Sequence, residues 1–188
     1  THTRGESIYV DDIPEWKGTL YAVPFDSPVA HGKIISLDIS EASLVKGVRK
    51  ILTYKDVSGE NQIGGIIRDE PLFAEDLVDF CGMPIALVVA ESEEIARASI
   101  KKIKVEIEKL PVIIDPREAA KQNKLIIPPR TFQIGDTQSQ WKNCAHIFEG
   151  IAENGGQEHL YIETQGAYAV PLENGNIKIY SSTRSEEQ

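Results

Sequence analysis

The chain has 188 residues, of which 41% are hydrophobic and 26% charged, a composition typical of a folded globular protein rather than a disordered one. With 20 Lys and Arg against 29 Asp and Glu, the formal net charge is −9, which argues against nucleic acid as a partner. No segment approaches the roughly 20 apolar residues of a membrane helix, no signal sequence is evident, and two cysteines are too few for a disulfide framework. We expect a soluble, cytoplasmic protein of one domain and part of a second.

The first third of the sequence is predicted to consist mainly of short strands. Ser40 can cap a short helix that Gly47 ends, and the Gly-rich residues 56–65 indicate a turn-rich loop. The predicted strands in this part cover 20–23, 33–39 and 48–54.

The strongest core signal is the continuous apolar run 84–90, which is typical of a strand buried on both faces. Ser92 then caps a helix, and after it apolar and charged residues alternate over 103–108. Strand, helix and strand in this order predict a βαβ unit. The fold class is therefore α/β (α+β), with a partly parallel sheet.

A second region with a different pattern follows. Asp115 and Pro116 begin a short helix that ends near Asn123, and Pro128 and Pro129 come shortly afterwards. We place the domain boundary here, with residues 1–124 in the first domain and 125–188 in the second. The second domain is predicted to be β-rich, with strands at 145–152, 159–170 and 177–180 and a tight turn at 174–176.

The segment 155–163, GGQEHLYIE, has the densest set of chemically active side chains. As a strand it would place His159, Tyr161 and Glu163 on one face, with the first and last about 13 Å apart, too far to share a metal directly. These residues could be an acid, a base or a ligand. We favour a buried polar network that ties the strand to its neighbours, because buried polar groups need hydrogen bonds in either case.

The other candidates have structural interpretations. His31 lies in a loop before a strand, Cys144 and His146 have no partners at metal-ligand spacing, and Gly64-Gly65 and Gly155-Gly156 are best explained by turns that need a positive φ. The carboxylates at 91, 93 and 94 are expected to be a solvated helix start. The residues themselves therefore predict no catalytic or metal-binding site.

The order of the sequence motifs is more informative than any one of them. They are GESIYVDDI at 5–13, LYA at 20–22, SPVAHGKI at 27–34, NQIG at 61–64, DEPLFA at 69–74, GMPIALVVA at 82–90, VEIEKLP at 105–111 and GGQEHLYIE at 155–163. Together they resemble the molybdenum-binding part of the xanthine dehydrogenase and aldehyde oxidase family. The last motif is more similar to the xanthine dehydrogenase form than to that of carbon monoxide dehydrogenases.

The resemblance implies an α/β-hammerhead domain followed by a truncated start of a molybdopterin-binding domain. It implies hydroxylation of purines, aldehydes or N-heterocycles with oxygen from water. It further implies that molybdopterin holds the molybdenum and that electrons pass to 2Fe-2S clusters and FAD on other domains or subunits. The family's GFGGKE-type segment and late catalytic glutamate are not in this sequence. At the family's Ser-Thr-Gln position the sequence has Ser182-Thr183-Arg184, so Arg184 is the one candidate cofactor-binding residue.

We therefore expect an N-terminal fragment that is itself structural, inactive alone and free of bound cofactor, with the rest of the molybdenum-binding subunit as its partner. The start at Thr1, with Met83 as the only methionine, fits a trimmed chain. Unpaired strand edges around 177–180 predict some homodimerisation. The alternative is a non-catalytic, stand-alone hammerhead binding or assembly module. A lipoyl-like carrier is disfavoured because the turn at 174–176 has no Lys.

Overall fold

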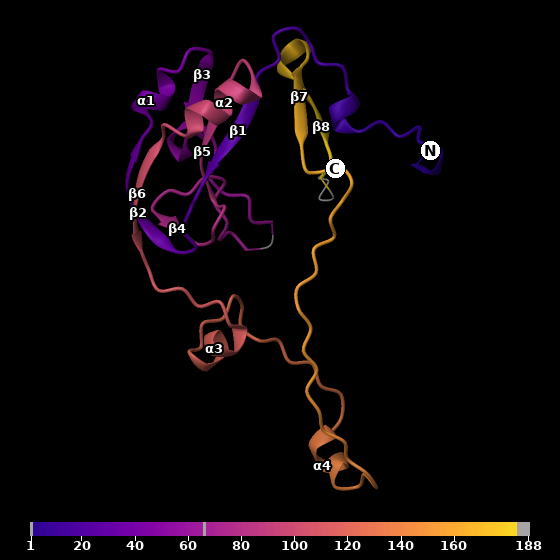
Figure 1. Cartoon of the computed structure of the whole chain (residues 1–188). Coiled ribbons are helices and arrows are strands. Elements are labelled where there is room, and N and C mark those ends of the chain that lie inside the picture. Colours follow the sequence, from indigo (N-terminus) through magenta and orange to yellow (C-terminus); the bar gives the residue numbers. More distant parts are fainter. Residues whose placement is uncertain (1, 66, 184–188) are drawn as a thin grey trace. The chain divides into compact units, whose positions relative to one another are not determined.

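The computed structural model describes residues 2–65 and 67–183, which form two compact units (Figure 1). One unit is continuous in sequence, from Trp16 to Ile127. The other combines Thr1–Glu15 with Pro128–Gln188. Each unit is described by itself below.

The continuous unit contains two three-stranded sheets. The first has the order β1-β5-β3 and the second the order β4-β2-β6, and every pairing in the two sheets is antiparallel. The strands of the first sheet are β1 (Tyr21–Asp26), β5 (Pro84–Ala90) and β3 (Val48–Leu52). Those of the second are β4 (Leu77–Val78), β2 (Gly32–Asp38) and β6 (Lys104–Lys109).

The predicted strand-helix-strand succession is present, but the predicted parallel pairing is wrong. Helix α2 (Glu93–Ile100) connects β5 to β6, yet β6 pairs with β2 in the other sheet. The reason is that both edges of β5 are already occupied, by β1 on one side and β3 on the other. A strand arriving from α2 has no free edge of β5 to pair with. All strand pairs among the described residues are antiparallel.

Two predicted helix starts are confirmed. Ser92 Oγ accepts a hydrogen bond from the backbone N–H of Ile95 at the start of α2. Asp115 caps α3 (Pro116–Lys121) by accepting from the N–H of Arg117, and proline occupies the first turn. At α1 (Ser40–Ser43) the predicted cap is wrong. Ser40 is the first helical residue and not the cap, and the Asp38 side chain accepts a hydrogen bond from its N–H.

The core of the continuous unit consists of two apolar clusters that share the strand β5. Ala86, Val88 and Ala90 of β5 enter the first cluster and Ile85 enters the second, while Leu87 and Val89 are half-buried, so the predicted burial is complete on one face and partial on the other. The first cluster contains Ala42, Ile51, Ala86, Val88, Ala90, Ala96 and Ile103, and the second contains Ala74, Val78, Met83 and Ile85. Helix α2 closes the first cluster with Ala96, and its Ser99 is also buried.

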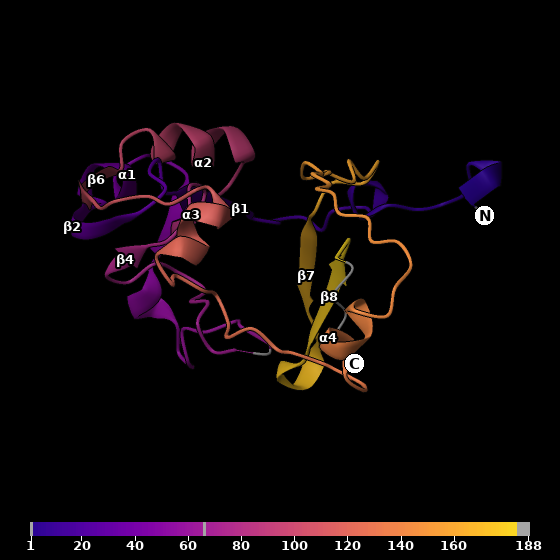
Figure 2. The ribbon, with the colours of Figure 1, turned by 90° about the horizontal axis from the view of Figure 1, so that it is seen from below.

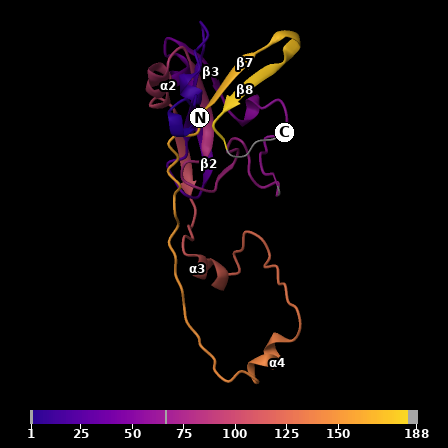
Figure 3. The same ribbon diagram turned by 90° about the vertical axis from the view of Figure 1, so that its right-hand side faces the viewer.

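The discontinuous unit contains one hairpin, formed by β7 (Ala167–Pro171) and β8 (Ile177–Ser181), which lie side by side in Figure 2. The predicted turn is confirmed: Asn174 and Gly175 both have positive φ, at 61° and 77°. Only the end of the predicted strand 159–170 is a strand, and 145–152 has no regular structure. The helix α4 (Thr137–Trp141) was not predicted. Between α4 and β7 the chain runs as a long uncoiled trace (Figure 3).

Short 3-10 turns complete the secondary structure: η1 (His2–Arg4), η2 (Val10–Asp12), η3 (Tyr54–Asp56) and η4 (Glu173–Gly175). Among the described residues no helix combines the length and the apolar character that crossing a membrane would require.

Ser99 allows a direct test of the packing between α2 and α1. Its buried hydroxyl donates to the carbonyl of Ala42 at 3.0 Å. The Ser99→Ala variant removes this bond while the Ala42 carbonyl keeps the backbone N–H of Val45 as a donor, so it is expected to lower the free energy of unfolding by about 0.5 to 1.5 kcal/mol. Urea unfolding measures the loss. Ser58→Ala, in an exposed loop, is the control, and an equal loss in both variants would contradict the packing argument.

Glu41 makes the stability of this unit depend on pH. The ammonium groups of Lys104 and Lys102 lie 3.4 and 3.5 Å from its carboxylate oxygens, and their hydrogen bonds lower the pKa of Glu41. Because the folded-state pKa is the lower one, the stabilisation is present above the ordinary carboxyl pKa of about 4.3. It is lost as the pH falls through the folded-state value.

We therefore expect Glu41→Gln to destabilise the chain at pH 7 and the difference from the parent to disappear in acid. Unfolding in urea across this pH range measures it. The control is Glu75→Gln, since Glu75 is exposed and forms no ion pair in the part of the chain that the structure describes. A difference that persists unchanged below the folded-state pKa would disprove the assignment.

Candidate functional site

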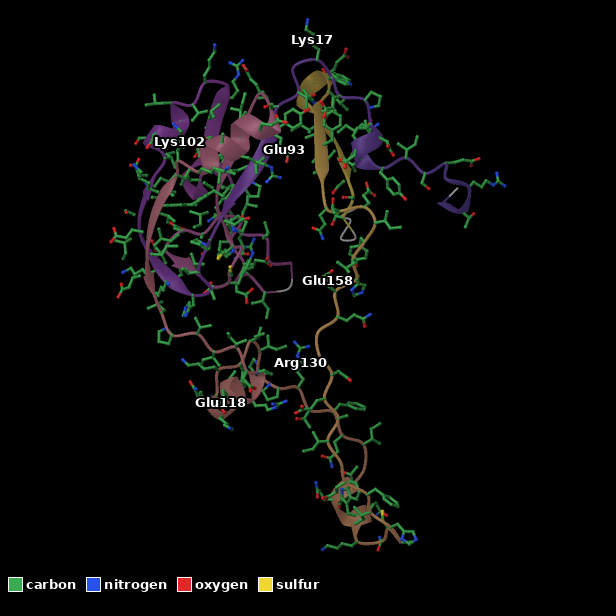
Figure 4. All side chains as sticks on the ribbon, viewed as in Figure 1. Lys17, Glu93, Lys102, Glu118, Arg130 and Glu158 are labelled. Atoms are coloured by element: carbon green, nitrogen blue, oxygen red, sulfur yellow. The ribbon has the colours of Figure 1, made fainter. Side chains whose placement is uncertain are left out.

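The chemically dense segment 155–163 does not form the predicted strand. Leu160 has a positive φ of 47°, which interrupts an extended backbone, and residues 155–162 are all exposed. The rings of His159 and Tyr161 nevertheless lie close, with centroids 5.5 Å apart and planes tilted by 39°. Glu158, labelled in Figure 4, lies on the same exposed trace, and its carboxylate accepts from the N–H of His159.

Glu163 is the residue of this segment that is partly buried. Its Oε1 accepts a hydrogen bond of 2.7 Å from the backbone N–H of Val10, in the N-terminal part of the same unit. The expected buried polar network is wrong for His159 and Tyr161, which are exposed, and only the Glu163 contact agrees with a structural role. The predicted alternation of His159, Tyr161 and Glu163 on one strand face is wrong, because the backbone is not a strand there.

The base of the hairpin lies next to this segment. Ser182 Oγ accepts from the N–H of Gly166 and donates to the carbonyl of Thr164, both at 2.8 Å, and the N–H of Ser182 donates to the carbonyl of Gly166. The end of β8 is thereby held against the residues that follow Glu163. Arg184, the candidate cofactor-binding residue, comes two positions later and lies outside the described residues.

His31 lies in the continuous unit, where three strand ends of the second sheet meet. Its Nδ1 is 2.9 Å from the carbonyl oxygen of Pro111, just after β6. Because a carbonyl can only accept, Nδ1 carries the hydrogen. Its Nε2 lies 4.0 Å from a carboxylate oxygen of Asp79, just after β4. The geometry supports a structural role for His31.

The remaining candidates do not converge. Cys81 and Cys144 are exposed free thiols in different units, and Cys144 donates to the carbonyl of Gln140 at the end of α4. In residues 2–65 and 67–183 no three His, Cys, Asp or Glu side chains gather in a way that could hold a metal ion. Glu91 and Glu93 form exposed ion pairs with Arg49 and Arg97, as expected for a solvated helix start.

Glu94 and Asp26 titrate away from their ordinary range for different reasons. A hydrogen bond from the Ser92 side chain and one from its own backbone N–H lower the pKa of Glu94 at the start of α2. Desolvation raises the pKa of Asp26 at the end of β1. The two carboxyls lie at separate places in the sheet unit and do not form a pair.

Asn61 and Gln62 have a structural role that the residue pattern did not predict. Asn61 donates to the carbonyl of Phe73 at 2.8 Å and accepts from its N–H at 3.0 Å, while Gln62 Oε1 accepts from the N–H groups of Gly64 and Glu70. The two amides close the loop 61–73 on itself. The sequence feature that could have indicated this role is the pair of adjacent amide side chains, Asn61 and Gln62, shortly before Gly64-Gly65.

The explanation of the glycine pairs by a positive φ is wrong, because neither pair is left-handed. Gly64 is instead required by a close approach: a Cβ there would lie 2.0 Å from the carbonyl oxygen of Ile67. At Gly155 and Gly156 a Cβ would meet nothing within 4 Å.

Comparison with known proteins gives the family. Residues 4–111 match the family model "Aldehyde oxidase and xanthine dehydrogenase, a/b hammerhead domain", which covers more than half of the chain. The chain belongs to the aldehyde oxidase and xanthine dehydrogenase family. Residues 117–188 match the molybdopterin cofactor-binding domain. The expected resemblance and the expected fold class are both confirmed.

Individual relatives agree over nearly the whole chain. Xanthine dehydrogenase/oxidase from Gallus gallus is 40% identical over 182 residues, covering 96% of this chain and 13% of the relative. Xanthine dehydrogenase from Calliphora vicina is 36% identical over 183 residues, 96% of this chain and 14% of the relative. The solved aldehyde oxidoreductase from Desulfovibrio gigas superposes with a TM-score of 0.82 and 32% identity, over 95% of this chain and 22% of that one. The chain thus spans less than a quarter of each of these proteins.

The described residues do not by themselves fit molybdopterin. A bound cofactor needs a concave, mostly enclosed site with converging polar groups. Residues 121–162 are exposed throughout, and no buried side-chain nitrogen or oxygen in the described ranges lacks a hydrogen-bond partner that a ligand could supply. The hollow beside α4 is lined partly by Ile134, Trp141 and Cys144 and has no cationic side chain. The described residues therefore support no reaction step through the cofactor.

Ser182 provides a test of the geometry at the hairpin base. The Ser182→Ala variant removes the acceptor of the Gly166 N–H, so exchange of that amide is expected to accelerate about fivefold, the effect of a hydrogen bond of about 1 kcal/mol. Amide exchange followed by NMR measures it. Ser181→Ala is the matched control, because Ser181 does not accept from Gly166 N–H. Unchanged exchange in Ser182→Ala would refute this contact.

Proposed function

We propose that this chain is the N-terminal piece of the molybdenum-binding part of a xanthine-dehydrogenase-like hydroxylase. The complete protein would hydroxylate a purine, an N-heterocycle or an aldehyde with oxygen taken from water. The electrons released would leave through 2Fe-2S clusters to FAD on other domains or subunits. Molybdopterin, when bound in the complete protein, supplies the molybdenum centre at which the substrate is oxidised.

The observation that carries this proposal is the match along almost the entire chain. Two consecutive family models, together reaching from residue 4 to 188, follow each other in the order of one enzyme family. Relatives named xanthine dehydrogenase cover 96% of the chain, and a solved aldehyde oxidoreductase has the same fold over 95% of it. A shared fold alone would not carry an activity, but sequence identity of 32 to 40% accompanies it here.

Within that enzyme the two regions have different proposed roles. We assign residues 1–124 to the hammerhead domain, a structural wall of the substrate channel and a contact surface for the iron–sulfur and FAD modules. Residues 125–188 are the start of the molybdopterin-binding domain. Exposed apolar side chains in this second region, Phe148, Ile151 and Ile162 among them, are more than nine-tenths accessible. The rest of the molybdenum-binding subunit is the partner we propose for them.

The chain alone is proposed to be catalytically silent and cytoplasmic. In the described ranges no three His, Cys, Asp or Glu side chains gather in a way that could hold a metal ion, and the family's catalytic glutamate has no counterpart in this sequence. Arg184 remains the proposed cofactor-binding residue, at the position of the family's glutamine. A fixed cation there would change the orientation of substrate or cofactor oxygen atoms relative to a neutral amide.

The alternative function is a stand-alone hammerhead module for binding or assembly. The observation in its favour is that residues Trp16–Ile127 form a continuous unit with its own core clusters. The reading frame after Gln188 distinguishes the two proposals. A frame that continues into a GFGGKE-like segment supports the enzyme, whereas a stop codon supports the module.

Metal content tests the proposal on protein in solution. The 188-residue chain incubated with molybdate and purified molybdopterin is expected to hold far less than one molybdenum per chain by elemental analysis. The complete protein, isolated from its source, is expected to hold molybdenum and to oxidise at least one purine, aldehyde or N-heterocycle. Stoichiometric molybdenum on the short chain would overturn its proposed inactivity, and a complete protein without molybdenum would overturn the enzyme proposal.

A further inference from the structure

The structure brings together two sequence motifs that the proposed function does not explain. Residues 5–13 and 155–163 are far apart in sequence, yet the N–H of Val10 donates to Glu163 Oε1 across 153 positions, at 2.7 Å and in a partly buried place. Both residues belong to the discontinuous unit. The contact therefore lies inside one unit and requires no assumption about how the two units are arranged.

The N-terminal turn leaves the Val10 donor available. Tyr9 N–H donates to the carboxylate of Asp12, Asp12 N–H donates back to the carbonyl of Tyr9, and Ile13 N–H donates to the carbonyl of Val10. These bonds use acceptors within the turn itself. The N–H of Val10 takes its acceptor from a distant segment instead, and a partly buried N–H without an acceptor would be unfavourable.

The environment of Glu163 is equally specific. Residues 151–162 are all exposed, and Glu163 is the first residue after them to be partly buried. Directly after it, Thr164 and Gly166 are held to Ser182 by hydrogen bonds. Glu163 thus directly precedes residues that are held at the base of the β7–β8 hairpin, while its side chain reaches the N-terminal turn.

Pairing between oppositely charged side chains does not account for this contact. Asp11 and Asp12 follow Val10 directly, so the turn is acidic and a carboxylate nearby meets like charges. If attraction between opposite charges held the turn, the residue at position 163 would be a Lys or Arg. The contact depends on a directed hydrogen bond to a backbone N–H, in which the charged acceptor makes the stronger bond.

We propose that Glu163 is a positioning residue that docks the turn 9–13 onto the base of the β7–β8 hairpin. Its carboxylate acts as an acceptor for a backbone donor and not as an acid, base or metal ligand. This contact attaches the N-terminal segment to the part of the same unit that contains residues 128–183. The proposal requires neither molybdenum nor substrate and does not rest on the proposed activity.

Amide hydrogen exchange of Val10 in the 188-residue chain tests this docking. Glu163→Ala removes the acceptor, and Val10 exchange is expected to accelerate about tenfold or more, as for loss of a hydrogen bond to a charged group. Glu163→Gln keeps an acceptor oxygen and removes the charge, so it is expected to retain most of the protection. Exchange is expressed relative to the amide of Leu172, which donates to the carbonyl of Asn176 in the same unit and corrects for any loss of stability of that unit.

Glu158→Ala is the matched control, because the Glu158 carboxylate accepts from the N–H of its neighbour His159 and lies on the exposed trace. It is expected to leave Val10 exchange unchanged. The proposal is overturned if Glu163→Ala leaves the Val10 to Leu172 ratio unchanged. It is also overturned if Glu158→Ala raises that ratio as much as Glu163→Ala does.

Discussion

Strand β5 is the element on which the rest of the continuous unit depends. It is the central strand of its sheet, paired on both edges, and its side chains enter both apolar clusters. Helix α2 follows it directly and packs against β1 and β5. Because both of its edges are taken, the chain after α2 must pair elsewhere, which is why β6 lies in the second sheet with β2. The two-sheet arrangement thus follows from the pairing of β5 on both of its edges.

Those parts of the fold whose cause is local could be predicted from the sequence. The apolar run of β5, the Ser92 cap of α2 and the Asp115-Pro116 start of α3 each act over a few neighbouring residues. The Asn174-Gly175 turn does so as well, since it needs two left-handed residues in succession. The direction of strand pairing could not be predicted, because it depends on which edges other strands have already occupied.

The candidate site also contains features that depend on distant partners and could not be predicted from the local sequence. Residues such as Ile147, Phe148 and Ile151 have the composition of a strand, but a strand also needs backbone partners, and none of the described strands pairs with them. An apolar composition indicates that a segment tends to be buried, but it does not identify the residues against which the segment packs. The roles of Glu163 and Asn61 likewise depend on backbone groups distant in sequence, which periodicity does not reveal. The family resemblance identified these segments without giving the contacts that they make.

The contact between Val10 and Glu163 also constrains the order of events during synthesis. A ribosome adds about 5 to 20 residues per second, so the acceptor emerges about 8 to 30 s after a donor that precedes it by 153 residues. In that interval the continuous unit can already be complete, because residues 16–127 need no later part of the chain to close their sheets. The N-terminal turn, by contrast, lacks its contact with Glu163 until that residue has been synthesised. Chaperones that act on nascent chains would meet this segment before its binding place exists.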